Sequence, residues 1–238
     1  MLNGKTPNWA EITAVFGGTF DPPHTGHVEA VRGLFEDPGV QRVLVLPTST
    51  PPHKPFLTSA EHRVAMVKLC FASSVHQNIQ IDLTEIERSM QRPGGYNYSF
   101  DTLQELSQRF HGSNQLAFVI GADQLASIEN WFRFPEVLDL CHWIVLARKP
   151  SGLATALQAI QKLEASNLLK KRGDGPTGSS QLWHIGKMSS FLRIVDTRAP
   201  EISSTDVRQA LCRNGSAPEG SLVPAVEAYL KLHHLYGT

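Results

Sequence analysis

The sequence predicts an α/β protein with an open, mostly parallel sheet covered by helices on both faces. Two observations support this class. Short apolar runs recur along the 238 residues, and several are apolar at nearly every position, as expected for parallel strands that are buried on both faces. Segments with helical patterning separate most of these runs, and such alternation of strand and helix is typical of a parallel sheet.

The individual elements follow from these patterns and from local start signals. We expect strands at 13–16, 42–47, 79–83, 116–121, 143–147 and 192–196. Several of the expected helices open with Ser, Thr or Pro, which favour the first positions of a helix. These helices are expected at 25–36, 59–72, 99–110, 135–141, 203–213 and 223–232. The resulting arrangement is Rossmann-like.

A single domain is expected over residues 1–238, because 41% apolar content in a chain of this length can form a full core. One segment differs from the rest. A polar helical stretch begins at Gln158, ends in KKR and continues into GDGPTGSS, and the Gly, Ser and Pro of that run disfavour regular structure. We therefore expect an exposed insertion around 158–181.

Composition limits the partners and the compartment. Lys and Arg (22) equal Asp and Glu (22), so no overall charge attracts nucleic acid or an anionic membrane. No stretch approaches the roughly 18 apolar residues of a membrane helix. Three widely separated cysteines without a C-x-x-C pair predict buried thiols in a reducing compartment. We expect a cytoplasmic protein that binds neither nucleic acid nor membrane, with a homo-oligomer left open.

The strongest functional signal is GGTFDPPHTGH (17–27), which joins the first strand to the first helix. In an open parallel sheet, ligands bind beyond the carboxyl ends of the strands, and amides at a helix start suit phosphate. Gly17 and Gly18 would allow close approach of a nucleotide. His24 and His27 could both point toward a phosphate and donate to it, as neutral or charged rings. Capping the turn would explain one histidine alone; the pair favours function.

Other phosphate and metal motifs do not fit. The sequence contains neither G-x-G-x-x-G nor G-x-x-x-x-G-K-[ST], which counts against oxidoreductases and P-loop kinases. The two histidines lack a nearby third ligand for zinc, so we expect no metal site in the protein itself.

Two further loops follow strands at the same edge of the sheet. PTSTPPHKP (47–55) presents Lys54, a mobile charge suited to phosphate, although a solvated surface lysine is about equally plausible for this loop alone. GAD (121–123) follows the fourth strand. There Gly121 allows close approach, and Asp123 could either accept from ribose hydroxyls or cap the next helix.

Two later segments offer a ring-binding site and an anion site. In NWFRFP (130–135), Trp131 and Phe132 could frame a flat ring, with core packing as the alternative for each. In EISSTDVR (201–208), a serine cap would leave free amides and hydroxyls facing outward. Arg208, one turn into the helix, could reach the same anion with a forked cation.

Taken together, these motifs carry a resemblance. GGTFDPPHTGH, PPHK, GAD and ISSTDVR occur in the order and spacing of the nucleotidyltransferase superfamily. The H-x-G-H and ISST-x-x-R elements are shared with pantetheine-phosphate adenylyltransferases and cytidylyltransferases. PPHK, YSFDTL (98–103), FVIGADQL (118–125) and NWF make the chain resemble bacterial nicotinate-nucleotide adenylyltransferases, over about residues 11–150 and 190–236. The family usually has threonine where Ser99 stands.

The resemblance implies an activity and a set of roles. The activity is adenylyl transfer from ATP to nicotinate mononucleotide, giving deamido-NAD and pyrophosphate, with Mg²⁺ arriving with ATP and no protein nucleophile. The catalytic residues would be His24, His27, Lys54 and Arg208. ATP would contact Gly17, Gly18, Thr19, Phe20, Gly26, Gly121, Asp123, Ile202, Ser203, Ser204 and Thr205. The acceptor nucleotide would contact Ser99 and Phe132, through main-chain amides, together with Thr102 and Trp131.

Three alternatives remain at the level of sequence. The same chemistry could use nicotinamide mononucleotide or phosphopantetheine as acceptor, although chain length and PPHK disfavour phosphopantetheine. A non-catalytic nucleotide-binding protein could retain the scaffold, but it should have lost a phosphate-facing residue. A histidine-metal hydrolase is the third alternative, and metal analysis of the purified protein distinguishes it.

Overall fold

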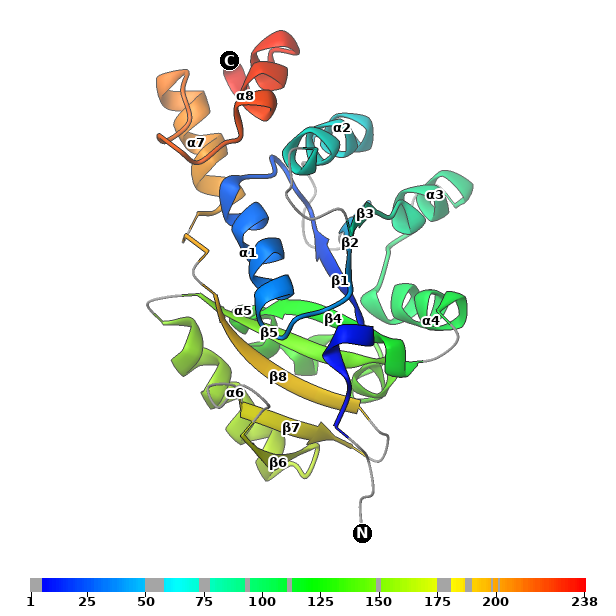
Figure 1. The fold of residues 1–238 in the computed structure, drawn as a ribbon. Coiled ribbons are helices and arrows are strands. Elements are labelled where there is room, and N and C mark those ends of the chain that lie inside the picture. The colour runs from blue at the N-terminus through cyan, green and yellow to red at the C-terminus, as the bar shows by residue number, and fades with distance from the viewer. Residues whose placement is uncertain are drawn as a thin grey trace.

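The architecture is a single eight-stranded sheet between two layers of helices (Figure 1). The computed structural model describes residues 6–49, 58–72, 78–92, 95–110, 113–148, 151–174, 181–186, 190–197, 199–200 and 202–238. Within these residues, the strand order is β3-β2-β1-β4-β5-β8-β7-β6. The mostly parallel α/β class expected from the sequence is confirmed.

The six strands predicted from apolar runs are all present and mutually parallel. They are β1 (Thr13–Gly18), β2 (Arg42–Pro47), β3 (Ile79–Ile81), β4 (Leu116–Gly121), β5 (His142–Arg148) and β8 (Ser190–Thr197). The chain order reverses direction between β1 and β4, since β2 and β3 lie on one side of that pair and β5 and β8 on the other. Open α/β sheets bind ligands at such a switch point.

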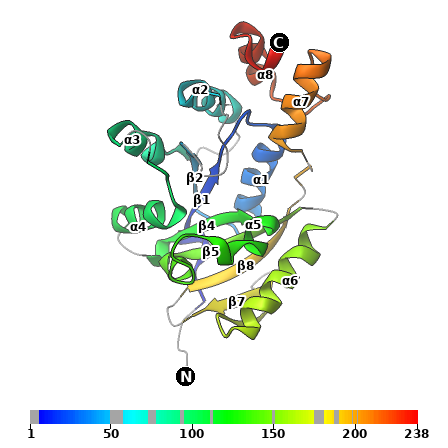
Figure 2. The ribbon, with the colours of Figure 1, turned by 180° about the vertical axis from the view of Figure 1, so that it is seen from behind.

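The sheet is buried on both faces, which explains the continuous apolar runs. Along β1, Ala14 and Phe16 pack into one core cluster with residues of α1, α2, α7 and α8. Val15, between them, packs into the other cluster with residues of α4, α5 and α6. Successive side chains of a strand point to opposite faces, so both faces demand apolar residues. Figure 2 shows α4 and α6 on the face that α1 does not cover.

Five predicted helices agree with the structure to within about a residue at each end, and their start signals work as expected. Ser203 caps α7 by accepting from the backbone N–H of Asp206 at 3.1 Å, and Pro224 occupies the first turn of α8. Gly215 ends α7 with φ of 68°, a conformation that glycine adopts without strain. The five are α1 (Thr25–Glu36), α2 (Ala60–Phe71), α4 (Ser99–Arg109), α7 (Ser204–Asn214) and α8 (Pro224–Leu232).

Several short elements differ from the sequence-based expectation. The helix expected at 135–141 is a 3-10 helix, η4 (Glu136–Leu140). Two helices were missed entirely, α3 (Thr84–Gln91) and α5 (Ala122–Ala126), because each is short and buries few residues. Of α6 (Gly152–Ala165), only the part from Gln158 on was expected to be helical. The remaining 3-10 turns are η1 (Trp9–Glu11), η2 (Ser113–Gln115), η3 (Ile128–Asn130) and η5 (Leu235–Gly237).

Over residues 158–174 the structure does not have the exposed insertion that was expected around 158–181. Its first part is the second half of α6 (Gly152–Ala165), where Ala159, Ile160 and Leu163 are buried at helical spacing. KKR belongs to β6 (Leu169–Asp174), which pairs antiparallel with β7 (Gln181–Ile185) at the sheet edge. Exposed charges are a common way to protect an edge strand. We propose that the whole chain is one domain, since one sheet contains every described strand.

The cysteines agree with the prediction in two of three cases. Cys70 and Cys141 are buried free thiols, and burial raises the pKa of each to about 12. Cys212, in α7, is exposed instead, and its Sγ donates to the carbonyl oxygen of Tyr236 at 3.2 Å. Among the described residues, no helix is long and apolar enough to cross a membrane.

Candidate active site

Two cavities meet at the switch point of the sheet, beyond the carboxyl ends of β1 and β4. The larger, of about 660 Å³, is lined from β1, α1, the start of α5, the end of β5 and the starts of α6 and α7. The smaller, of about 320 Å³, lies toward α4 and the segment after η3. Gly17, Val119 and Gln124 line both. Two molecules bound in these cavities would therefore meet over the glycines of β1.

Most of the predicted site residues line one of these cavities. His27, Gly121, Asp123, Ile202 and Ser203 line the larger cavity. The residues of the smaller cavity are Gly18, Thr19, Ser99, Trp131 and Phe132, and Gly17 belongs to both.

Three glycines of the site leave little room for a side chain. A Cβ atom on Gly18 would lie 2.9 Å from the ring of Phe20, and one on Gly26 would lie 3.0 Å from Nδ1 of His24. A Cβ on Gly121 would collide with the carboxylate of Asp123. Glycine thus lets the loop after β1 fold tightly under the cavities and brings the start of α1 against His24.

The two histidines stack on one another at the start of α1. His24 is the N-cap residue of α1 and is 2% exposed. Its ring centroid lies 3.6 Å from that of His27, with the planes 27° apart. The backbone N–H of His24 donates to Nδ1 of His27 at 3.1 Å. A neutral imidazole that accepts at Nδ1 carries its proton on Nε2, so His27 offers an Nε2–H donor.

Burial sets the protonation state of this pair. Desolvation, with a smaller effect of Arg148, lowers the pKa of His24 to about 4. Desolvation, followed by the charges of His24 and Arg148, lowers the pKa of His27 well below its usual value. Both rings are therefore neutral near pH 7 when no anion is bound. The sequence allowed them to donate to phosphate as neutral or as charged rings, and the structure favours the neutral form.

Phe20 packs against His27, one of the two histidines. Its side chain is 1% exposed and packs edge-on against the ring of His27, with centroids 4.9 Å apart. Phe16 also approaches His27 edge-on, at 6.1 Å. The side chain of Phe20 thus orients His27 and does not line either cavity.

The start of α7 is bonded to the loop that joins β1 to α1. Ser203 donates to Oδ2 of Asp206 at 2.6 Å as well as capping the helix, and Ser204 donates to the carbonyl oxygen of Pro22 at 2.9 Å. Residues that are 182 positions apart in sequence, Pro22 and Ser204, are therefore in direct contact.

Arg208 lies beside the cavities and does not line either of them. Its Nη1 donates to the carbonyl oxygen of Asp21 at 2.5 Å, and its Nη2 donates to the hydroxyl of Thr205 at 3.3 Å. Ser204, Thr205, Gly26 and the buried His24 are likewise absent from the cavity walls. These residues shape the wall that His27 and Ser203 present.

The smaller cavity combines a helix start with aromatic rings. Ser99 is the first residue of α4, and the first N–H groups of a helix have no partner within it. Phe132 is 46% exposed and stacks on Tyr98 with centroids 4.5 Å apart. Trp131 is half-buried and packs edge-on against Phe118 at 6.2 Å. A flat ring with an anionic group would find both partners here.

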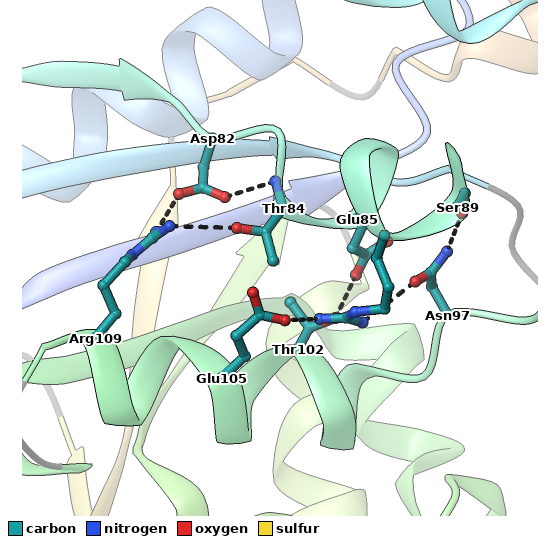
Figure 3. Close-up of polar contacts among 9 residues, drawn as sticks. Asp82, Thr84, Glu85, Ser89, Asn97, Thr102, Glu105 and Arg109 are labelled. Carbon is teal, nitrogen blue, oxygen red and sulfur yellow. Dashed lines mark hydrogen bonds and ion pairs between the residues drawn. The ribbon is translucent and has the colours of Figure 1, made fainter. Parts of the chain in front are cut away.

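Thr102 lies behind this cavity. It is 1% exposed, donates to Oε1 of Glu85 at 2.9 Å and accepts from Nη1 of Arg88 at 3.1 Å. Figure 3 shows the contact of Thr102 with Glu85 and the neighbouring ion pair of Arg109, in α4, with Asp82, which precedes α3. Glu85 lines the smaller cavity, and burial raises the pKa of its carboxyl. Thr102 therefore positions Glu85 and is not part of the cavity wall.

Lys54 lies outside the described residues, but the described residues on both sides of 50–57 are held by one buried arginine. Arg63, 2% exposed, donates from Nη2 to the carbonyl oxygen of Ser49 at 2.9 Å and from Nε to that of Thr58 at 3.0 Å. Its Nη1 donates to the carbonyl oxygens of Thr19 at 2.9 Å and Thr48 at 2.6 Å. Arg63 thus ties the flanks of 50–57 to the loop after β1.

Sequence reasoning missed several residues of the cavity walls. Arg148 directly follows the predicted strand 143–147, and its position at a carboxyl end was the available signal. Gln124 accepts from the backbone N–H of Gly121 at 2.9 Å. Glu85 and the residues at the start of α6 lie in no recognisable motif, so no signal in the sequence pointed to them. Other missed residues of the larger cavity include Ser151, Gly152, Thr155 and Asp206, besides apolar residues of the strands and of α5.

Within the described part of the chain, no group of three or more His, Cys, Asp or Glu side chains is arranged to hold a metal ion. The larger cavity does present two carboxylates, those of Asp123 and Asp206. Carboxylate oxygens suit the water shell of a hard cation such as Mg²⁺.

Known proteins share this sequence and this fold. The cytidylyltransferase-like family model matches residues 15–210. A "Probable nicotinate-nucleotide adenylyltransferase" of Sodalis glossinidius (strain morsitans) is 34% identical, with 94% of this chain and 97% of the relative covered. One with the same name from Yersinia enterocolitica serotype O:8 / biotype 1B (strain NCTC 13174 / 8081) is 34% identical and covers 99% of both chains.

The fold recurs in a solved structure. Plasmodium falciparum nicotinic acid mononucleotide adenylyltransferase complexed with NaAD has a TM-score of 0.67 at 15% identity, covering 94% of this chain and 96% of that one. The same enzyme complexed with APC gives a TM-score of 0.67 at 14% identity, with the same coverage. Family model, relatives and fold agree with the motifs, and the chain belongs to the nicotinate-nucleotide adenylyltransferases of the cytidylyltransferase-like family.

Proposed function

We propose that this protein transfers the adenylyl group of ATP to nicotinate mononucleotide, giving deamido-NAD and pyrophosphate. The observation that carries the proposal is the meeting of the two cavities at Gly17, with His27 on the border of the larger one. Each nucleotide occupies one of the two cavities, and the reacting phosphates meet where the backbone of β1 allows the closest approach.

ATP occupies the larger cavity. The Nε2–H of His27 and the amides at the starts of α1 and α7 face its phosphates, since helix starts favour anions. Asp123 accepts from ribose hydroxyls, and Arg148 provides a cation at the end of β5. Lys54 and Arg208 supply further positive charge to the phosphates. His24 stacks behind His27 and fixes its orientation.

Nicotinate mononucleotide occupies the smaller cavity. Its pyridine ring lies against Phe132, with Trp131 nearby, and stacking of this kind contributes about 1 kcal/mol. Its carboxylate faces the amides at the start of α4, where Ser99 stands. A helix N-terminus stabilises a carboxylate more than a neutral carboxamide, which supports nicotinate over nicotinamide as the base.

The reaction is an in-line displacement. An oxygen of the acceptor phosphate forms a bond to the α-phosphorus of ATP while the bond from that phosphorus to the bridging β-oxygen breaks, and pyrophosphate leaves with the negative charge. His27 donates to phosphate oxygens as charge develops on them. Arg208 and Lys54 act on the same charge, and no side chain is needed as a nucleophile.

Magnesium accompanies ATP in this proposal. When bound, it neutralises charge on the departing pyrophosphate and keeps part of its water shell. Asp123 and Asp206 are the side chains whose oxygens would hold those waters. We propose the cytoplasm as the compartment, where free thiols such as those of Cys70 and Cys141 remain reduced.

The test is pyrophosphate release from magnesium-ATP with a single acceptor at a time. Release with nicotinate mononucleotide, and much slower release with nicotinamide mononucleotide, supports both the reaction and the assignment of the α4 start. Equal rates with the two mononucleotides contradict the base assignment. Release only with phosphopantetheine, or with no acceptor, contradicts the proposed reaction.

A further inference from the structure

A tyrosine from the last turn of the chain reaches the loop between β1 and α1. The hydroxyl of Tyr236, in η5, donates to Oδ1 of Asp21 and accepts from the hydroxyl of Thr58 at 3.0 Å. Asp21 is 2% exposed and lies three residues before His24. A buried carboxylate needs hydrogen-bond donors. The hydroxyl of Tyr236 supplies a donor to Asp21 that solvent cannot supply at this buried position.

Arg208 contacts the same aspartate without closing on its carboxylate. Its Nη1 donates to the backbone carbonyl of Asp21 at 2.5 Å, while the distance from that nitrogen to the carboxylate oxygen Oδ2 is 4.0 Å. Arginine and carboxylate form short, strong paired hydrogen bonds when both are free to do so. At this position the pair is held open.

The turn that carries Tyr236 is fixed in an unfavourable conformation. Tyr236 has φ of 58°, in the left-handed region that bulky residues avoid. Several contacts hold it there: Cys212 donates to its carbonyl oxygen at 3.2 Å, and Thr238 donates to the carbonyl of Leu230 at 2.9 Å. Burial, followed by the contact with Asp21, raises the pKa of Tyr236, so its hydroxyl remains protonated. Such strain persists only where the surroundings enforce it.

We infer that Tyr236 is a positioning residue for adenylyl transfer: its hydroxyl satisfies Asp21, keeps Arg208 off the Asp21 carboxylate, and so leaves the guanidinium free to turn toward the phosphates of ATP when they bind. Without that hydroxyl, the buried carboxylate of Asp21 draws the guanidinium inward. The loss of Arg208 from the phosphates then lowers the rate, although Tyr236 touches no substrate. This inference rests on the proposed function, because the proposed function gives Arg208 its role.

The first test compares Tyr236→Phe with Tyr229→Phe. Tyr229 is a matched control because its hydroxyl also bonds a half-buried partner in the same region, Nδ1 of His62 at 2.9 Å, without contacting Asp21. Tyr236→Phe should lower kcat about 10- to 100-fold, the effect of a small misplacement of a catalytic group. The KM for the acceptor should stay near that of wild type, and Tyr229→Phe should retain wild-type kcat.

A double-mutant cycle separates positioning from general loss of structure. In an Arg208→Ala background, Tyr236→Phe should lower kcat no further, because the two changes act through one group. Adding Asp21→Asn to Tyr236→Phe should restore part of kcat, since asparagine has no charge to attract Arg208. It also removes the unsatisfied buried carboxylate, so this double variant can be measured if Tyr236→Phe alone folds poorly.

A structural readout keeps this inference distinct from the proposed function. In a crystal structure of Tyr236→Phe, Arg208 should lie within hydrogen-bond distance of the Asp21 carboxylate. An unmoved Arg208, an equal kcat in both Tyr→Phe variants, or additive losses in the Arg208→Ala background would each overturn the inference. A wild-type protein that releases no pyrophosphate would instead overturn the proposed function, while the position of Arg208 would still decide this inference.

Discussion

Lowering the pH should destabilise the fold through His24. This imidazole is buried at the start of α1, and burial lowers its pKa from 6.5 to about 4. Between those values the unfolded chain binds a proton that the folded chain does not, so the free energy of unfolding decreases as pH falls. The full shift corresponds to about 3 kcal/mol, of which about 2 kcal/mol is lost between pH 7 and pH 5.

The perturbation is His24→Asn, which keeps a good N-cap residue and removes the titrating ring. Urea unfolding at pH 5, 6, 7 and 8 measures the free energy of unfolding of both proteins. Wild type should lose about 2 kcal/mol more than the variant between pH 7 and pH 5. His142, with a pKa also lowered to about 4 by burial, contributes equally in both proteins and cancels. Parallel curves for the two proteins would refute the reasoning.

Four further predictions concern the site. His27→Ala removes the Nε2–H donor and should lower kcat about 100-fold in steady-state assays; turnover near wild type would remove its catalytic role. Arg208→Ala should lower kcat and kcat/KM together, and a rise in KM alone would count against its role at the transition state. Phe132→Ala should raise the KM for nicotinate mononucleotide about 5-fold by the loss of stacking, with kcat retained; an unchanged KM would place the ring elsewhere. Arg63→Met removes a buried guanidinium that donates to four carbonyls, one buried and three partly buried, and should cost about 3 kcal/mol or more in urea unfolding; a loss below about 1 kcal/mol would show that water replaces the guanidinium.

The sheet could be predicted because burial on both faces makes a parallel strand apolar at every position. That is why Val15 and Phe16 are both buried although they face opposite layers. The signal fails at the antiparallel edge. KKR in β6 has exposed side chains, so nothing in its composition separates an edge strand from a solvated loop.

The site could be predicted where chemistry is local and not where it depends on packing. Gly17, His27 and Ser203 lie in motifs whose residue types already indicate phosphate binding, and all three line the larger cavity. The stacking of His24 behind His27 depends on how tightly the loop folds, which the spacing alone does not give. Thr102 and Tyr236 act through residues distant in sequence, Glu85 and Asp21, and only the folded chain brings those pairs together.

The most direct test of adenylyl transfer follows the oxygen atoms. Wild-type protein is incubated with magnesium-ATP and nicotinate mononucleotide whose phosphate carries ¹⁸O. The products are then separated, and their masses are measured by mass spectrometry. Direct attack by the acceptor phosphate predicts deamido-NAD that retains all the label, with unlabelled pyrophosphate. Labelled pyrophosphate, free AMP without dinucleotide, or AMP attached to the protein would contradict the account.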